Sequence, residues 1–196
     1  KQALEEAKIS FTEGEVPVGA VSVLNNKILV RSGNKMQKSK NPINHAEIIV
    51  LYRSAKILAE LGKSVRYEKL DLYVTLEPCA MCAQAISLMR INNLFYGADD
   101  SKGGSVKHGA KIFEQKTCHY RPKIYSNILS KDSEKLLKEF FKKLRKLGHL
   151  QKCFIVFVHL RLSKNKTKYQ DQSKRFYIKT FSLLAQLEKV MMGWRQ

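Results

Sequence analysis

The stretch that most constrains the fold is residues 72–82, LYVTLEPCAMC. An apolar run with β-forming residues leads into Pro78, which cannot donate a hydrogen bond to a sheet and so ends the expected strand. Cys79 and Cys82 follow at the start of an expected helix, where the helix dipole favours the thiolate form. The pattern predicts a buried strand followed directly by a helix that carries two sulfur ligands.

A second stretch, residues 44–47 (NHAE), places a histidine and a carboxylate two residues apart at another expected helix start. Catalytic zinc takes three protein ligands and keeps a fourth position for water, so His45 with Cys79 and Cys82 would form such a set. Glu47 is then suited to carry a proton from an activated water to a leaving amine. The two stretches together predict one catalytic zinc with a base beside it.

Three other interpretations of these residues remain open from the sequence. The Cys-x-x-Cys pair also occurs as a redox motif, although Pro78 and the Ala-Met between the cysteines are not its usual surroundings. A closed structural zinc site would need a fourth ligand such as Cys118 or His119. Asn44 as N-cap with Glu47 three residues later would make a pair resembling a capping box.

The expected elements are a helix, a hairpin, and then helices and strands in alternation. This order predicts an α/β fold, a three-layer αβα sandwich with a mixed central sheet. The segment 32–42 is expected to be a loop, 153–160 to be a strand, and 181–192 to be a helix. The remaining expected elements are helices at 1–12, 45–61, 79–90 and 132–147, and strands at 16–24, 27–31, 70–76 and 93–96.

The composition indicates a globular, strongly basic protein. Lys and Arg number 36 against 17 Asp and Glu, a net charge of +19, and basic residues are in excess on both sides of Gly148. Such a charge favours a polyanionic partner. Four cysteines, two of them paired as Cys-x-x-Cys, fit a reducing compartment, so the expected location is cytoplasmic. The apolar run 153–160 is far below the ~18–20 residues of a membrane span.

His45-x-Glu47 and Pro78-Cys79-x-x-Cys82 match the signature H-x-E…P-C-x-x-C of zinc-dependent nucleobase deaminases. Within that cytidine-deaminase-like superfamily, the chain resembles the bacterial tRNA-specific adenosine deaminases. The resemblance covers about residues 1–148. It rests on four stretches: 14–21 (GEVPVGAV), 41–47 (NPINHAE), 72–82 (LYVTLEPCAMC) and 96–104 (YGADDSKGG).

The resemblance implies a hydrolase that converts the wobble adenosine of a tRNA anticodon to inosine. One zinc ion per subunit would be bound by His45, Cys79 and Cys82, with Glu47 as the proton shuttle. The substrate would be an anticodon stem-loop, and the family forms homodimers in which both subunits contact RNA.

The resemblance also implies a set of substrate contacts. Asn34 aligns with an asparagine that hydrogen-bonds the flipped base, and the backbone around Ala46 would help to hold the base. Asp100 aligns with an aspartate that contacts the RNA backbone, and Lys102 would shape the same loop. By contrast, His108 lies in a loop and is expected to be solvated rather than a ligand.

The chain departs from the family at two places. Asn44 stands where the family usually has Ala, and a surface amide is the expected consequence. Residues 149–196 have no counterpart, so the expected domains are a deaminase domain at 1–148 and a basic C-terminal extension at 149–196. Two other functions remain open: a deaminase of a free nucleobase or nucleoside, of the cytosine or guanine type, and a non-catalytic zinc-stabilised RNA-binding protein, which would not need Glu47.

Overall fold

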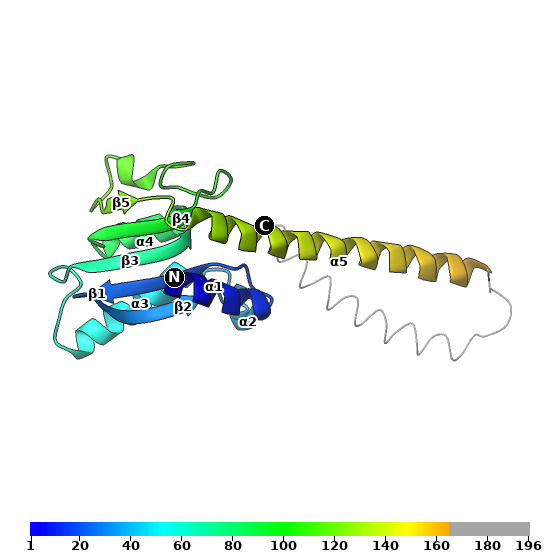
Figure 1. Ribbon diagram of the computed structural model, residues 1–196, viewed down its shortest axis with the longest axis horizontal. Helices are drawn as coiled ribbons and strands as arrows, with labels where there is room; N and C mark the ends of the chain where they lie inside the picture. Colours follow the sequence, from blue (N-terminus) through cyan, green and yellow to red (C-terminus); the bar gives the residue numbers. More distant parts are fainter. Residues whose placement is uncertain (165–196) are drawn as a thin grey trace. The chain divides into compact units, whose positions relative to one another are not determined.

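Five β-strands form one mixed sheet in the order β2-β1-β3-β4-β5 (Figure 1). The computed structural model describes the backbone of residues 1–164 and the side chains of residues 1–147. The chain divides into two units, of which the first, Lys1–Phe140, contains the sheet, and the second begins at Phe141. The strands are β1 (Gly19–Leu24), β2 (Lys27–Gly33), β3 (Leu70–Leu76), β4 (Asn93–Ala98) and β5 (Lys123–Tyr125).

A tight hairpin forms one side of the sheet. Strands β1 and β2 pair antiparallel, and Asn25 and Asn26 connect them with φ angles of 50° and 60°. A two-residue hairpin loop of type I′ needs positive φ at both positions, and asparagine tolerates that conformation better than most residues. The predicted hairpin and its turn are therefore confirmed.

The other side of the sheet is parallel. Strand β3 pairs antiparallel with β1 and parallel with β4, and β4 pairs parallel with β5. The chain passes from β3 through α4 (Ala80–Leu88) to β4, which is the helical crossover that parallel neighbours require. The segments that follow β3 and β4 therefore leave the sheet at the same edge.

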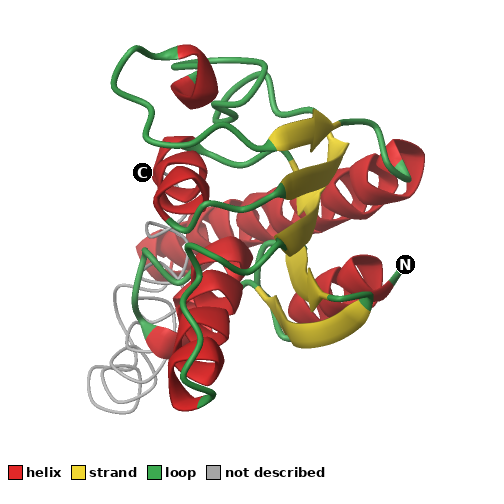
Figure 2. Cartoon of the chain, turned by 90° about the vertical axis from the view of Figure 1, so that its left-hand side faces the viewer, coloured by secondary structure: helices red, strands yellow, loops and turns green. Residues whose placement is uncertain are grey.

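Helices cover both faces of the sheet, as Figure 2 shows. Successive residues of a strand point to opposite faces of the sheet, so Gly19 and Ala20 face different layers of helices. Ala20 belongs to the apolar core that contains residues of α3 (Ala46–Glu60) and α4, whereas Gly19 faces α1 (Gln2–Thr12). The predicted αβα layers with a mixed sheet are confirmed.

Helix α1 approaches the sheet so closely that it requires glycine in β1. A Cβ atom added to Gly19 would lie 2.0 Å from the Ala3 carbonyl oxygen and 2.6 Å from the Ala7 nitrogen. Both atoms belong to the helix backbone, so the helix would have to move. The small side chains of Ala3 and Ala7, both buried, are the other half of this contact.

Gly19→Ala should therefore lower the free energy of unfolding by about 1–3 kcal/mol, the usual cost of overpacking a core. Chemical denaturation would measure the change. Lys8→Ala, on the exposed side of the same helix, is the matched control and should stay within about 0.5 kcal/mol of the wild type. Equal stability of Gly19→Ala and the wild type would contradict the close packing of α1.

Two sequence predictions outside the core are wrong. Residues 153–160 are part of α5 (Ser130–Lys164) rather than a strand, because a short apolar run does not distinguish the two structures and the helix continues through Gly148. The segment 32–42 is not entirely a loop. Its first two residues belong to β2, which ends at Gly33, and it contains the short helix α2 (Met36–Ser39). The Glu15 carboxylate accepts a hydrogen bond from the Lys38 backbone at 2.8 Å, which stabilises that helix at its start.

The expected helix at 181–192 lies outside the described residues. The short strand β5 and the 3-10 helix η1 (Ile112–Glu114) were not predicted. Among the helices that the structure describes, none combines the length and the hydrophobicity that a membrane span needs.

Candidate metal centre and active site

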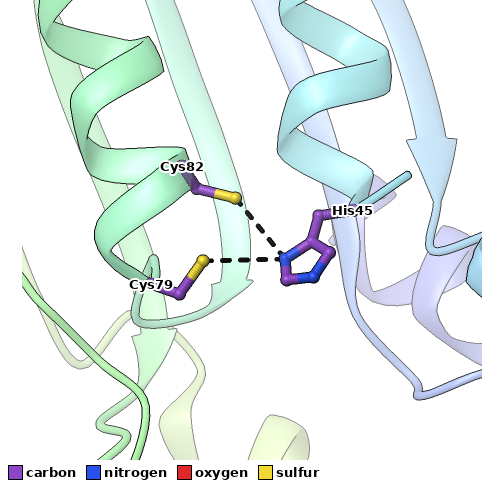
Figure 3. A group of neighbouring side chains, drawn as sticks. All are labelled: His45, Cys79 and Cys82. Carbon is purple, nitrogen blue, oxygen red and sulfur yellow. Dashed lines mark hydrogen bonds between the residues drawn. The ribbon is translucent and has the colours of Figure 1, made fainter. Parts of the chain in front are cut away.

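Three metal-ligand side chains meet at one place in the first unit. The Nδ1 atom of His45 lies 3.7 Å from Cys79 Sγ and 3.5 Å from Cys82 Sγ (Figure 3). One donor atom from each residue lies within 4.8 Å of the others. The structure thus brings together the three residues that the sequence predicts as metal ligands.

Helix starts place these donors. His45 is the N-cap of α3 and Cys79 is the N-cap of α4, both with extended backbone angles. Cys82 lies one turn into α4 and is fully buried. Pro78 separates Cys79 from the end of β3 at Leu76, so a buried strand sets the position of the cysteine helix. Both helix N-termini present positive dipole ends to the cluster, which favours anionic sulfur.

The two cysteines of the cluster differ in their electrostatics. Hydrogen bonds from Cys82 and then from His45 lower the pKa of Cys79 to about 4, although burial acts in the opposite direction. The same Cys79–Cys82 hydrogen bond, together with burial, raises the pKa of Cys82. The hydrogen bond to Cys79 also raises the pKa of His45. A thiolate is therefore available at neutral pH, as metal binding requires.

The donor set fits zinc. Two thiol sulfurs and one imidazole nitrogen are the soft and borderline ligands that zinc prefers. Among the residues with described side chains, no fourth histidine, cysteine or carboxylate joins the cluster. Cys118 Sγ instead lies 3.4 Å from Ser87 Oγ and 3.2 Å from the Tyr120 carbonyl oxygen. This excludes Cys118 as the fourth ligand of a closed site.

Glu47 lies in the first turn of α3 and is buried, with 4% of its surface exposed. Burial raises the pKa of its carboxyl group, whereas its interactions with His45 and with the Cys82 thiol lower it. The carboxyl group is therefore close to the metal ligands in a place that little water reaches. A carboxylate with a raised pKa is suited to accept and return protons near neutral pH.

The capping interpretation of Asn44 and Glu47 is wrong. The N-cap of α3 is His45, not Asn44, and no side chain makes a capping hydrogen bond there. The Asn44 side-chain nitrogen donates instead to Ser39 Oγ at 2.8 Å. Asn44 is therefore a partly exposed amide that ties residues before α3 together, which agrees with the expected surface role.

Asn34 directly follows β2 and Ala46 is the first residue of α3, and both residues are buried. The Asn34 backbone donates to the Val18 carbonyl and its own carbonyl accepts from Ser10 Oγ, at 2.9 and 3.3 Å. The hydrogen bonds found in residues 1–147 leave the Asn34 side-chain amide unused, so it is available to a ligand. Ala46 is fully buried in the first turn of α3, where backbone N–H groups have no intrahelical acceptor.

Asp100 and Lys102 lie in the loop that follows β4. The Asp100 carboxylate accepts hydrogen bonds from the backbone nitrogens of Lys102 and Gly103, at 3.0 and 3.1 Å. This turn leaves the Lys102 side chain exposed. The loop returns to the metal ligands, because Gly104 forms a backbone bridge with Cys79.

The sequence reasoning missed Glu77, the residue before Pro78. Its side chain is fully buried, and it accepts hydrogen bonds from the same loop, including one of 2.6 Å involving His108 Nδ1. His108 is therefore partly buried against Glu77, with 29% of its side-chain surface exposed, rather than fully solvated. A signal was present in the sequence: a carboxylate at the end of an apolar strand needs buried partners, and none is close in sequence.

Comparisons with known proteins assign the chain to a class and then to a family. A family model for the MafB19-like deaminases matches residues 1–145. This match, the αβα fold and the three-donor cluster define a deaminase domain. A tRNA-specific adenosine deaminase from Rickettsia felis is 49% identical over 147 residues, which cover 74% of this chain and 99% of the relative. The chain belongs to the family of tRNA-specific adenosine deaminases.

Other relatives agree with this assignment. The tRNA-specific adenosine deaminase of Agrobacterium fabrum is 44% identical over 143 residues, which cover 73% of this chain and 91% of the relative. A solved structure from studies of A-to-I editing by tRNA deaminases at the wobble position has a TM-score of 0.63 and 44% identity. That match covers 69% of this chain and 96% of the other.

More distant structures share only the fold. A guanine deaminase from Nitrosomonas europaea has a TM-score of 0.54 and 17% identity, over 70% of this chain and 80% of the other. At that identity the likeness supports the αβα architecture and says nothing about the substrate of this chain.

Proposed function

We propose that the protein hydrolyses the wobble adenosine of a tRNA anticodon to inosine. The observation that carries this proposal is the buried Glu47 beside the cluster of His45, Cys79 and Cys82. The names of the relatives, tRNA-specific adenosine deaminases at 44–49% identity, support adenosine in tRNA as the substrate. In the reaction, the bond between C6 of adenine and its amino nitrogen breaks, a bond from C6 to a water-derived oxygen forms, and ammonia leaves.

His45, Cys79 and Cys82 would hold the zinc ion. A bound zinc supplies a Lewis acid that lowers the pKa of water and so makes a nucleophile available at neutral pH. Glu47 takes a proton from the attacking water and passes it to the amino nitrogen that leaves. Its burial supports this role, because a raised pKa lets one carboxyl group act first as base and then as acid.

The substrate contacts proposed for this chain lie around that site. The unused amide of Asn34 would hydrogen-bond the flipped base, and the backbone N–H at Ala46 would help to orient it. Asp100 and Lys102 would meet the RNA backbone beside the flipped nucleotide. An exposed lysine suits a phosphate contact, since it neutralises charge without fixing sequence.

A competition between substrates tests the proposal. The zinc-loaded protein would be given an anticodon stem-loop with adenosine at the wobble position, and separately free adenosine, cytosine and guanine. Inosine in the stem-loop with the free compounds unchanged is the expected result. Consumption of free cytosine or guanine with an untouched stem-loop would instead support the nucleobase deaminase alternative.

Binding to the stem-loop should weaken steeply with salt, because cationic side chains displace counterions from phosphates. Contact with about five phosphates would give a slope of about −3.5 in log affinity against log salt, at about −0.7 per phosphate for single-stranded segments. Fluorescence anisotropy between low and physiological salt would measure it. Lys102→Ala should reduce the slope by about 0.7 if Lys102 touches a phosphate. A flat response would mean that the positive charge serves something other than RNA.

The protein is proposed to be a homodimer, which light scattering would test. Four cysteines, two of them a Cys-x-x-Cys pair of metal ligands, support a location in the reducing cytoplasm. Residues 1–148 are proposed as the deaminase domain and 149–196 as a basic extension, supported by a family match that ends at residue 145.

A further inference from the structure

Outside the metal cluster, the buried carboxylate of Glu77 accepts several hydrogen bonds from a single loop. Oε2 of Glu77 accepts from the Asp100 backbone N–H at 3.0 Å and lies 2.6 Å from His108 Nδ1. Its Oε1 accepts three further backbone N–H groups, those of Val106, Lys107 and His108, at 3.1, 2.8 and 3.0 Å. All five donors come from the loop 99–108, which follows β4.

The Glu77 side chain is fully buried, so no water is available to hydrogen-bond its oxygens in place of these five donors. A buried charge is tolerated only when hydrogen bonds satisfy it. The loop must therefore close around the carboxylate, and loss of the carboxylate would leave several buried donors unpaired.

The loop held in this way lies against the metal ligands. The Ser105 N–H donates to the Pro78 carbonyl at 2.9 Å, and Gly104 forms a backbone bridge with Cys79. The contact is close, because a Cβ atom on Gly104 would lie 2.4 Å from Glu77 Cδ. Glu77 thus joins the loop to the segment that carries the first cysteine ligand.

The loop carries both residues that are proposed to meet RNA outside the base pocket. The Asp100 carboxylate closes a turn onto the backbone of Lys102, and the backbone N–H of Asp100 is bound by Glu77. Glu77 Oε2 therefore holds the start of that turn by accepting the Asp100 N–H, in addition to the backbone contacts of Gly104 and Ser105 with Cys79 and Pro78.

We propose that Glu77 is a positioning residue that fixes the loop 99–108 so that Asp100 and Lys102 contact the RNA beside the reacting adenosine. This inference rests on the proposed function, because the contacts it positions are contacts with RNA. Glu77 acts through the loop and touches neither the metal nor the substrate. It is therefore expected to determine RNA binding more than the chemical step.

Glu77→Gln distinguishes the hydrogen bonds to Oε1 from those to Oε2. The glutamine oxygen can still accept the three backbone N–H groups of 106–108, but its NH2 group then faces the Asp100 N–H and cannot accept from it. In the zinc-loaded protein, the KM for the stem-loop should rise roughly tenfold or more, the effect of losing a hydrogen bond to a buried charge. The kcat and the zinc content should stay close to those of the wild type.

Amide hydrogen exchange tests the positioning directly and needs no substrate. The Asp100 amide should lose protection in Glu77→Gln while core amides of β3 keep theirs. Gly104→Ala keeps the Glu77 carboxylate but adds a Cβ that would clash with Glu77 Cδ and the Asp100 carbonyl, so it should push the loop away, raise the KM and expose the same amide. Glu60→Gln, on the exposed last turn of α3, is the matched control and should change neither readout.

Unchanged protection of Asp100 in both Glu77→Gln and Gly104→Ala would overturn the inference. A fall in kcat and zinc content with an unchanged KM would also overturn it, since Glu77 would then support the metal site rather than the loop. If the wild type leaves the stem-loop unmodified, the proposed function fails, and the exchange measurement still decides whether Glu77 positions the loop.

Discussion

Replacing Glu47 with Gln should reduce deamination of the stem-loop by about 10²–10⁴-fold, the range that general acid–base catalysis contributes. Glutamine keeps the size of the buried side chain but can neither take a proton from water nor return one to the amino nitrogen. Because Glu47 is not one of the three clustered donors, the variant should still bind zinc. Single-turnover rates and metal analysis of the same sample would measure both effects.

Glu60→Gln provides the control, because it makes the same chemical change at an exposed position of the same helix. It should retain wild-type rates. A Glu47→Gln variant with nearly normal rates would show that another group carries the proton. A variant that loses zinc as well as activity would show that Glu47 helps to hold the metal site together.

Removing one cysteine of the cluster should abolish both metal binding and activity. Cys82→Ala leaves two donors where catalytic zinc needs three, so the zinc content should fall to near zero. Metal binding also stabilises a folded protein, by about 4 kcal/mol when the free metal is 1,000 times its Kd. A chelator should therefore lower the melting temperature of the wild type and leave that of Cys82→Ala almost unchanged.

Cys118→Ala is the matched control for this experiment. Cys118 contacts Ser87 and the Tyr120 carbonyl rather than the cluster, so its loss should leave zinc content and rate intact. Zinc loss in Cys118→Ala would mean that the site has a fourth protein ligand and is structural. Full activity of Cys82→Ala would contradict the three-ligand site altogether.

The sequence predicts the parts of this fold that local chemistry determines. The Asn25–Asn26 turn follows from the tolerance of asparagine for positive φ, and the strand before Pro78 follows from its apolar run. The extent of α5 does not follow in the same way. The apolar run 153–160 fits a strand or a helix equally. It is helical because α5 (Ser130–Lys164) continues through it.

The same division applies to the candidate site. Cys79 and Cys82 are predicted from their Cys-x-x-Cys spacing and His45 from its place two residues before Glu47 at another helix start, because zinc ligands belong to few residue types. Glu77 is not, because its five donors come from a loop more than twenty residues away, and a lone carboxylate in sequence does not reveal them. The prediction that Asn44 caps α3 is wrong for a related reason. Asparagine is favoured at N-cap positions, but in the fold the N-cap of α3 is His45.

The most direct test of the central claim is deamination of an anticodon stem-loop in water labelled with heavy oxygen, followed by mass spectrometry of the nucleosides. Wild-type protein loaded with zinc should produce inosine only at the wobble position, with one heavy oxygen in its base, and Glu47→Gln should produce almost none. An unmodified stem-loop, or inosine without the label, would contradict hydrolysis of the wobble adenosine at this site.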